Sequence, residues 1–217
     1  PRDYWTQVID IELPPIVRFE RQGGGKEAIE NAANLLSKAK FPVILSGAGV
    51  VLGGAIDECK KLAEKLDAPV CNGYQHNDSF PGTHPLAVGP LGYNGSKAAM
   101  ELISKADVVL ALGTRLNPFS TLPGYGIDYW PKKATIIQVD MNPDRIGLTK
   151  KVSVGICGDS KQVAQQILEK LSSDAGDTGR EERKNLIHKT KSAWLQTLSG
   201  LDHEDDDPGT VWNKEAR

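Results

Sequence analysis

The fold class of this chain is decided by residues 41–54, which read Phe-Pro-Val-Ile-Leu-Ser-Gly-Ala-Gly-Val-Val-Leu-Gly-Gly. The run from Val43 to Leu45 is apolar and bounded by proline and glycine, which is typical of a short strand covered on both faces. A glycine-rich turn over 47–54 and an amphipathic helix follow, and residues 68–71 then form a second short strand. Strand, turn, helix and strand within about 30 residues indicate a βαβ unit.

The same alternation continues on both sides of this unit. Apolar spacing predicts helices over 26–40 and 97–105, and short apolar runs predict strands over 107–113, 134–140 and 152–157. Strands that alternate with helices predict an α/β fold, a doubly wound and mainly parallel sheet with helices on both faces, of the Rossmann-like type.

The segments between the predicted strands and helices contain helix caps and two long loops. Asn94 or Ser96 caps the helix over 97–105, Asp159 caps a last helix of the domain, and Asn142-Pro143 is a favourable helix start. The regions 72–96 and 114–133 are long loops rich in glycine and proline, and loops of this length inside a compact domain are usually functional or disordered.

The chain divides into three parts by composition. Residues 1–22 form an extended lead-in from a preceding domain, interrupted by Pro14-Pro15. Residues 23–172 form the Rossmann-like domain, and residues 173–217 form a linker and a helix towards a following domain, with an acidic exit after Asp202. The start at Pro1, without a methionine, predicts a piece of a longer polypeptide.

Charge and cysteine content exclude several classes of protein. The net charge is −2 and the isoelectric point is about 6.1, so nothing predicts a nucleic-acid or anionic-membrane partner. No run of about 18 apolar residues predicts a membrane span. Three cysteines are an odd, sparse set, which favours a reducing compartment and a cytoplasmic location over a disulfide framework.

The ends of the strands locate the candidate site. Right-handed crossovers place the loops after residues 46, 71, 113, 140 and 157 at one edge of the sheet. Gly47, Ala48 and Gly49 would let backbone amides approach an anion at a helix start, although a tight structural turn explains the same glycines. The spacing is one residue longer than the usual dinucleotide fingerprint, which argues against an ordinary NAD site.

Two charged side chains belong to the same loops. Arg115 would pair a phosphate in a bidentate fork, or form a salt bridge to a neighbouring loop. Asp140 would accept from ribose hydroxyls, or cap a helix. His76 and His84 match no metal motif, and no catalytic or metal-binding group is predicted in this segment.

Several stretches, taken in order, carry a resemblance to a known family. They are Pro42 to Gly49, Gly89 to Gly92, Asp107 to Arg115, Ile137 to Asp140 and Gly158-Asp159, with Pro1 to Tyr4 similar to the segment that closes a first domain. Together they resemble the central domain of thiamine-diphosphate-dependent enzymes of the acetolactate synthase group. Residues 72–78 and 119–130 resemble an acetyltransferase branch of that group.

The resemblance implies a six-stranded parallel sheet, and a homodimer or homotetramer of the parent protein. It also implies that thiamine diphosphate and Mg²⁺ are held by the flanking pyrimidine-binding and diphosphate-binding domains of the same chain. Some relatives bind FAD or an adenine nucleotide in the central domain. The corresponding cofactor-binding positions here are Gly47, Ala48, Gly49, Gly92, Tyr93, Asn94, Gly113, Thr114, Arg115, Asp140, Met141, Gly158 and Asp159.

Two departures from the family pattern bear on this pocket. FAD-binding relatives carry Met-His where this chain has Tyr93-Asn94, and Asp-Asp-Arg where it has Asn117-Pro118-Phe119. The departures favour a vacant or adenine-nucleotide site over FAD. Other interpretations that stay open are an acetolactate synthase central domain, a stand-alone NAD- or FAD-binding module, and an interaction domain without a ligand.

Overall fold

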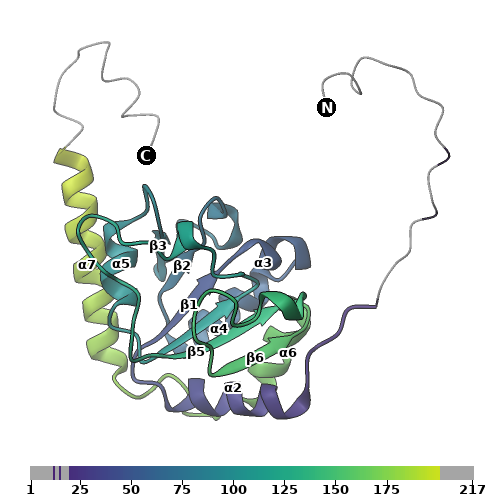
Figure 1. The fold of residues 1–217 in the computed structure, drawn as a ribbon. Coiled ribbons are helices and arrows are strands. Elements are labelled where there is room, and N and C mark those ends of the chain that lie inside the picture. The colour runs from purple at the N-terminus through teal and green to yellow at the C-terminus, as the bar shows by residue number, and fades with distance from the viewer. Residues whose placement is uncertain (1–11, 13–14, 16–19, 201–217) are drawn as a thin grey trace.

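The computed structural model describes residues 12, 15 and 20–200, shown in Figure 1. The lead-in predicted over 1–22 lies mostly outside the described residues, and the acidic exit after Asp202 lies wholly outside them. Within the described part, residues 26–170 form the sheet domain and a long helix follows it.

The sheet has six parallel strands in the order β3-β2-β1-β4-β5-β6, which confirms the predicted fold class. The strands are β1 (Pro42–Ser46), β2 (Val70–Asn72), β3 (Ala87–Pro90), β4 (Val108–Leu112), β5 (Thr135–Asp140) and β6 (Val154–Cys157). Every residue of β1 and β4 is buried, because these apolar runs lie at the centre of the sheet with helices on both faces. The strand order reverses between β1 and β4.

Two groups of helices cover the two faces (Figure 1). On one face α2 (Lys26–Lys38) and α4 (Ile56–Leu66) both pack against α6 (Ser160–Lys170). On the other face α5 (Lys97–Ile103) lies against α7 (Arg180–Gly200). The buried stripes follow the predicted helical spacing, as in α4, where Cys59, Leu62, Ala63 and Leu66 face the core.

Helix starts agree with the predicted caps. The Ser96 hydroxyl accepts a hydrogen bond from the amide of Ala99, so Ser96 and not Asn94 caps α5. The Asp159 carboxylate accepts from the amides of Lys161 and Gln162 at 3.1 and 3.2 Å and caps α6.

Two local predictions are wrong, and a third is confirmed in part. The region 72–96 is not one loop, because β3 lies within it as a four-residue edge strand. Residues 48–53 are not a turn but a short helix, α3 (Ala48–Gly53), which ends at Gly54 in the left-handed region. Asn142 caps a helix start and Pro143 is its first residue, as predicted, but the helix is only a single 3₁₀ turn, Pro143–Arg145.

The predicted linker over 173–179 is tied to the domain by the buried guanidinium of Arg183. This group donates to the carbonyls of Lys40, Leu66, Asp67, Gly176 and Thr178. Its carbonyl partners belong to the chain before β1, the end of α4 and the linker itself. The first half of α7 is thereby fixed against the sheet domain.

Candidate functional site

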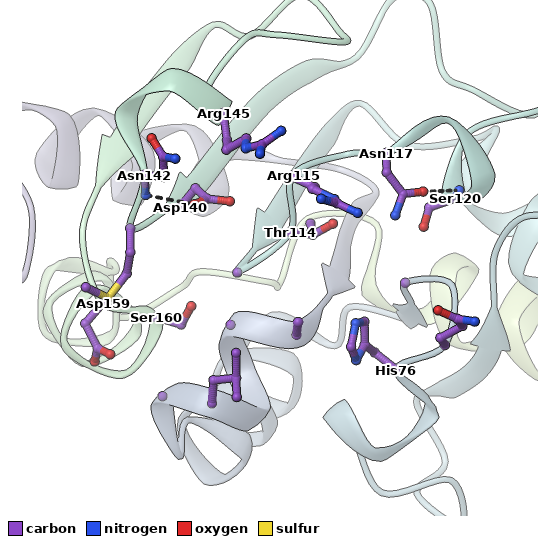
Figure 2. Close-up of a pocket in the computed structure, with 18 of the residues that line it drawn as sticks. His76, Thr114, Arg115, Asn117, Ser120, Asp140, Asn142, Arg145, Asp159 and Ser160 are labelled. Atoms are coloured by element: carbon purple, nitrogen blue, oxygen red, sulfur yellow. Dashed lines mark hydrogen bonds between the residues drawn. The ribbon is translucent and has the colours of Figure 1, made fainter. Parts of the chain in front are cut away.

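A cavity of about 680 Å³ opens at the carboxyl edge of the sheet, above the point where the strand order reverses. Its walls come from the segments after β1, β2, β4, β5 and β6, so the predicted convergence of five strand-end loops is confirmed. Open parallel sheets bind ligands at this position, since the flanking loops separate there. Figure 2 shows the polar side chains of this cavity.

Glycines bring two backbone segments together at the floor of the cavity. A Cβ atom on Gly47 would lie 2.6 Å from the carbonyl oxygen of Gly113, and one on Gly49 would lie 2.7 Å from the Cα atom of Gly113. The chain between β1 and α3 therefore touches the chain that leaves β4. Close packing of backbone on backbone explains these glycines, as the structural interpretation of the turn required.

The amides of this turn are already engaged. Gly47 donates to the carbonyl of Leu112 at 3.0 Å, and Gly49 donates to that of Gly113 at 2.8 Å. Helix α3 has only six residues. Positive charge at the cavity therefore comes from side chains and not from these two amides.

Two arginines supply that charge, Arg115 from the loop after β4 and Arg145 from the loop after β5. In Figure 2 their guanidinium groups lie on the same side of the cavity, and His76 from the segment after β2 lies across from Arg115. Both arginines are exposed, and neither pairs with a carboxylate among the residues that the structure describes. Two unpaired guanidinium groups on adjacent loops suit a phosphate-bearing ligand.

Gln138 fixes the two arginine-bearing loops relative to each other. Its side chain is 1% exposed, and its amide nitrogen donates to the carbonyls of Thr114 and Arg145 at 3.2 and 3.1 Å. Its amide oxygen accepts from the amide of Gly147 at 2.9 Å. A buried, fully bonded amide in β5 thus holds the backbone beside Arg115 and at Arg145.

The two carboxylates of the cavity already have partners. Asp140 accepts from the amide of Asn142 at 2.9 Å, whereas the cap of the following 3₁₀ turn is Asn142, so the helix-capping interpretation of Asp140 is not confirmed. Asp159 caps α6 and lies 3.5 Å from a guanidinium nitrogen of Arg21, which in turn donates to the carbonyl of Gly53. Arg21 therefore closes one end of the cavity.

The structure gathers most, but not all, of the residues predicted for a cofactor. Ala48, Gly49, Gly113, Thr114, Arg115, Asp140, Met141 and Asp159 line the cavity. Gly47 and Gly158 are not among the residues that line it. Gly92, Tyr93 and Asn94 lie outside it because they follow the edge strand β3, where Gly92 (φ 92°) packs against the carbonyl of Phe119.

Sequence reasoning missed several residues at the site. Arg21, Arg145, Ser160 and the segment Tyr74-Gln75 line the cavity without having been singled out. Arg145 has no local pattern around it, and the only available signal was its place in a loop that follows a predicted strand. His76 was considered for a metal, and it now belongs to the cavity wall.

The described residues contain no group of three or more histidines, cysteines or carboxylates placed to hold a metal ion. His84 lies 3.2 Å from the carboxylate of Glu64, and the nearest acidic partner of His76 is Asp78 at 4.0 Å. No helix within residues 20–200 is long and apolar enough to cross a membrane.

Comparison with known proteins identifies the family. The family described as "Thiamine pyrophosphate enzyme, central domain" matches residues 29–167, from α2 to α6. This chain belongs to that family. The matched segment contains all six strands of the sheet and all the residues that line the strand-end cavity except Arg21.

Three relatives show which members of this family the chain is similar to. The chain is 78% identical over its whole length to a probable sulfoacetaldehyde acetyltransferase of Rhizobium meliloti and 75% identical to a sulfoacetaldehyde acetyltransferase of Roseovarius nubinhibens. It is 34% identical, over 93% of its length, to a probable acetolactate synthase large subunit of Methanocaldococcus jannaschii. The chain spans only 37%, 36% and 33% of the length of these three relatives.

The described part of this central domain does not fit thiamine diphosphate itself. A diphosphate held through Mg²⁺ needs oxygen ligands for the metal, usually one or two carboxylates. The lining of the cavity includes two carboxylates, Asp140 and Asp159, and these are already engaged by a backbone amide and by the cap of α6. The described residues hold no group of three or more histidines, cysteines or carboxylates placed for a metal ion.

Proposed function

We propose that this chain is the central domain of a longer sulfoacetaldehyde acetyltransferase, which converts sulfoacetaldehyde and phosphate to acetyl phosphate and sulfite. The observation that supports this most is the 78% identity over all 217 residues to the Rhizobium meliloti relative. The acetolactate synthase relative at 34% identity makes acetolactate synthesis the second candidate.

In this proposal the reacting groups lie outside the chain. Thiamine diphosphate and Mg²⁺ would be held by a preceding pyrimidine-binding domain and a following diphosphate-binding domain. The lack of a metal-ligating cluster in the described residues supports this division. The central domain would act as a scaffold between those domains in a cytoplasmic homodimer or homotetramer.

The cavity at the carboxyl edge would take an adenine nucleotide. Arg115 and Arg145 would bind its phosphates, and Asp140 would lie towards the ribose. The two unpaired guanidinium groups support a phosphate-bearing ligand. The departures at Tyr93-Asn94 and Asn117-Phe119 argue against FAD.

The activity is tested on the protein made with the polypeptide that flanks these 217 residues. We expect sulfite and acetyl phosphate from sulfoacetaldehyde when thiamine diphosphate, Mg²⁺ and phosphate are all supplied, and no acetyl phosphate when phosphate is left out. Pyruvate is tested in parallel. Acetolactate formed from pyruvate, without acetyl phosphate from sulfoacetaldehyde, would replace the first candidate by the second.

The proposed placement of thiamine diphosphate and Mg²⁺ in the flanking domains is tested on the 217-residue chain alone. Calorimetric titration with thiamine diphosphate and Mg²⁺ should give no binding heat, since the described residues offer no metal-ligating cluster. Binding in the micromolar range would contradict the proposed placement of the cofactor in other domains.

A further inference from the structure

An aromatic surface lies beside the cavity, over the loops that follow β3 and β4. Tyr93, Phe119 and Tyr125 are 70%, 57% and 56% exposed. Exposed aromatic side chains that gather on one part of a soluble protein often mark an interaction site. We define the aromatic surface by Tyr74, Tyr93, Phe119, Leu122, Tyr125 and Trp194.

Ring contacts pair four of these side chains, and the Tyr125 hydroxyl donates to the carbonyl of Gly95, in the same loop as Tyr93. The rings of Tyr74 and Phe119 stack with centroids 5.6 Å apart, and the amide of Tyr93 donates to the carbonyl of Phe119. The rings of Tyr125 and Trp194 meet edge to face at 5.7 Å, which carries the surface onto α7. In Figure 1 the end of α7 stands beside the loops at this edge of the domain.

The loops under the aromatic surface are uncharged. Residues 86–96 and 116–127 contain no lysine, arginine, aspartate or glutamate. Charge-poor, aromatic-rich surfaces are typical of the centre of a protein–protein interface. Anionic membranes and nucleic acids bind through lysine and arginine, so the composition favours a protein surface as the occupant.

The route of the chain indicates which protein surface this is. Leu195, the residue after Trp194 on α7, is 60% exposed, and the described helix runs to Gly200, less than two turns beyond Trp194. The chain covers only 37% of the length of its Rhizobium meliloti relative. A domain that follows residue 217 is tethered to α7 by the same chain, which raises its effective concentration at the aromatic surface above that of a separate protein.

We propose that the aromatic surface is the docking site for the domain that follows this chain in the longer polypeptide. This inference rests on the proposed function only in so far as the chain is the central part of a longer protein. Tyr93 and Phe119 would be buried there, and Trp194 would be enclosed between Tyr125 and the docked domain. The entry side of the chain is different, because Arg21 and Gln22 lie against Gly53 and Asp159 at the far end of the cavity.

Photo-crosslinking in the full-length protein tests the proposal. p-Benzoyl-phenylalanine is placed at position 93 in one variant and at position 195 in a second, so that poor folding of one leaves the other informative. A third variant carries it at the exposed Asn34 on α2, on the opposite face of the sheet, as the control. Peptide mapping then locates each crosslink.

We expect positions 93 and 195 to crosslink to peptides that follow residue 217 in the same chain, with monomer mass on a denaturing gel, and position 34 not to reach those peptides. Crosslinks of dimer mass would assign the surface to a second copy and overturn the proposal. Crosslinks to a preceding domain, or none, would overturn it as well. Turnover is measured in the same preparations, so an active enzyme without the crosslink refutes only the docking site, and a crosslinked protein without acetyl phosphate production refutes only the proposed activity.

Discussion

The amide nitrogen of Gly49 donates a hydrogen bond to the carbonyl oxygen of Gly113, 2.8 Å away, where the strand order of the sheet reverses. The bond joins the start of the β1–α4 connection to the end of β4. It requires two residues without side chains, since a Cβ atom on either would lie 2.7 Å from the Cα atom of the other. The floor of the cavity is therefore set by backbone packing.

Alanine at position 49 should destabilise the fold. The added methyl group would press on Gly113 and on the Ser160 hydroxyl, and overpacking of this kind costs about 1–3 kcal/mol. Gly82→Ala is the control, because Gly82 is exposed in a turn and its Cβ atom would meet nothing within 4 Å. Urea unfolding compares the two variants with the parent. Equal midpoints for Gly49→Ala and Gly82→Ala would show that the close approach does not constrain the fold.

Among the arginines of residues 20–200, Arg183 should be the most sensitive to conservative substitution. Its side chain is 1% exposed and gives hydrogen bonds to five backbone carbonyls, whereas lysine has only three N–H donors on one atom. Each buried carbonyl left without a donor costs about 1–3 kcal/mol, so Arg183→Lys should lose at least about 2 kcal/mol.

The control for this substitution is Arg180→Lys. Arg180 lies one turn earlier on α7, is about one third exposed and pairs with the carboxylates of Asp67 and Asp177. Ion pairs at partly exposed positions contribute about 0–1 kcal/mol, so the change should be small. Denaturant unfolding measures the free energy of unfolding of both variants. A smaller loss of this free energy for Arg183→Lys than for Arg180→Lys would contradict the role given to the buried guanidinium.

The three thiols should differ in reactivity. Burial raises the pKa of Cys59 to about 12, against a hydrogen bond with Ser46 that lowers it, and burial raises the pKa of Cys71 further. Cys157 is exposed. Because the thiolate is the reacting form, an aromatic disulfide reagent at pH 8 should label one thiol quickly in the native chain and three in denaturant. Cys157→Ser should abolish the fast phase, and a second fast thiol would contradict the burial.

The same raised pKa values give the stability a pH dependence. A thiol whose pKa is higher in the folded than in the unfolded chain contributes stability below the unfolded value, and this is lost as pH rises towards the folded value. For Cys59 the window runs from about 9 to about 12. The free energy of unfolding should therefore fall above pH 9, as measured by urea titration at a series of pH values.

The sequence predicted the parts of the fold that local pattern determines. The buried runs of β1 and β4, the stripe of α4 and the Asp159 cap are each explained by residues close together in the chain. β3 was not predicted from the sequence, because it has only four residues and includes Gly89 (φ 93°) and Pro90. It is held as an edge strand by pairing with β2. Its strand character comes from a distant partner.

The residues of the candidate site also differ in whether the local sequence predicts them. Arg115 was predicted because it directly follows a strong strand, and the edge of a parallel sheet gives such a residue its place. Arg145 was not, because its position depends on Gln138, seven residues earlier, bonding to the carbonyls of both Thr114 and Arg145. A glutamine within an apolar run does not show which loops it joins.

The last prediction concerns the ligand of the cavity, in the full-length protein. ADP should bind, and Arg115→Gln and Arg145→Gln should each weaken it about tenfold or more, because a hydrogen bond to a charged group contributes about 1.5–3 kcal/mol and 1.4 kcal/mol is a factor of ten. Higher salt should weaken binding to the parent protein more than to either variant, since an exposed guanidinium is screened.

Arg180→Gln is the matched control for these titrations. It removes an arginine that pairs with Asp67 and Asp177 and does not line the cavity, so ADP affinity should not change. FAD should not bind, because Asn117, Pro118 and Phe119 replace the Asp-Asp-Arg of FAD-binding relatives and Gly92 to Asn94 lie outside the cavity. Isothermal titration with ADP and FAD, together with the absorbance of the purified protein, measures both. Stoichiometric flavin that survives purification would contradict the exclusion of FAD. Equal ADP affinity in the parent protein and the two cavity variants would show that the arginines of the β4 and β5 loops do not form the phosphate site.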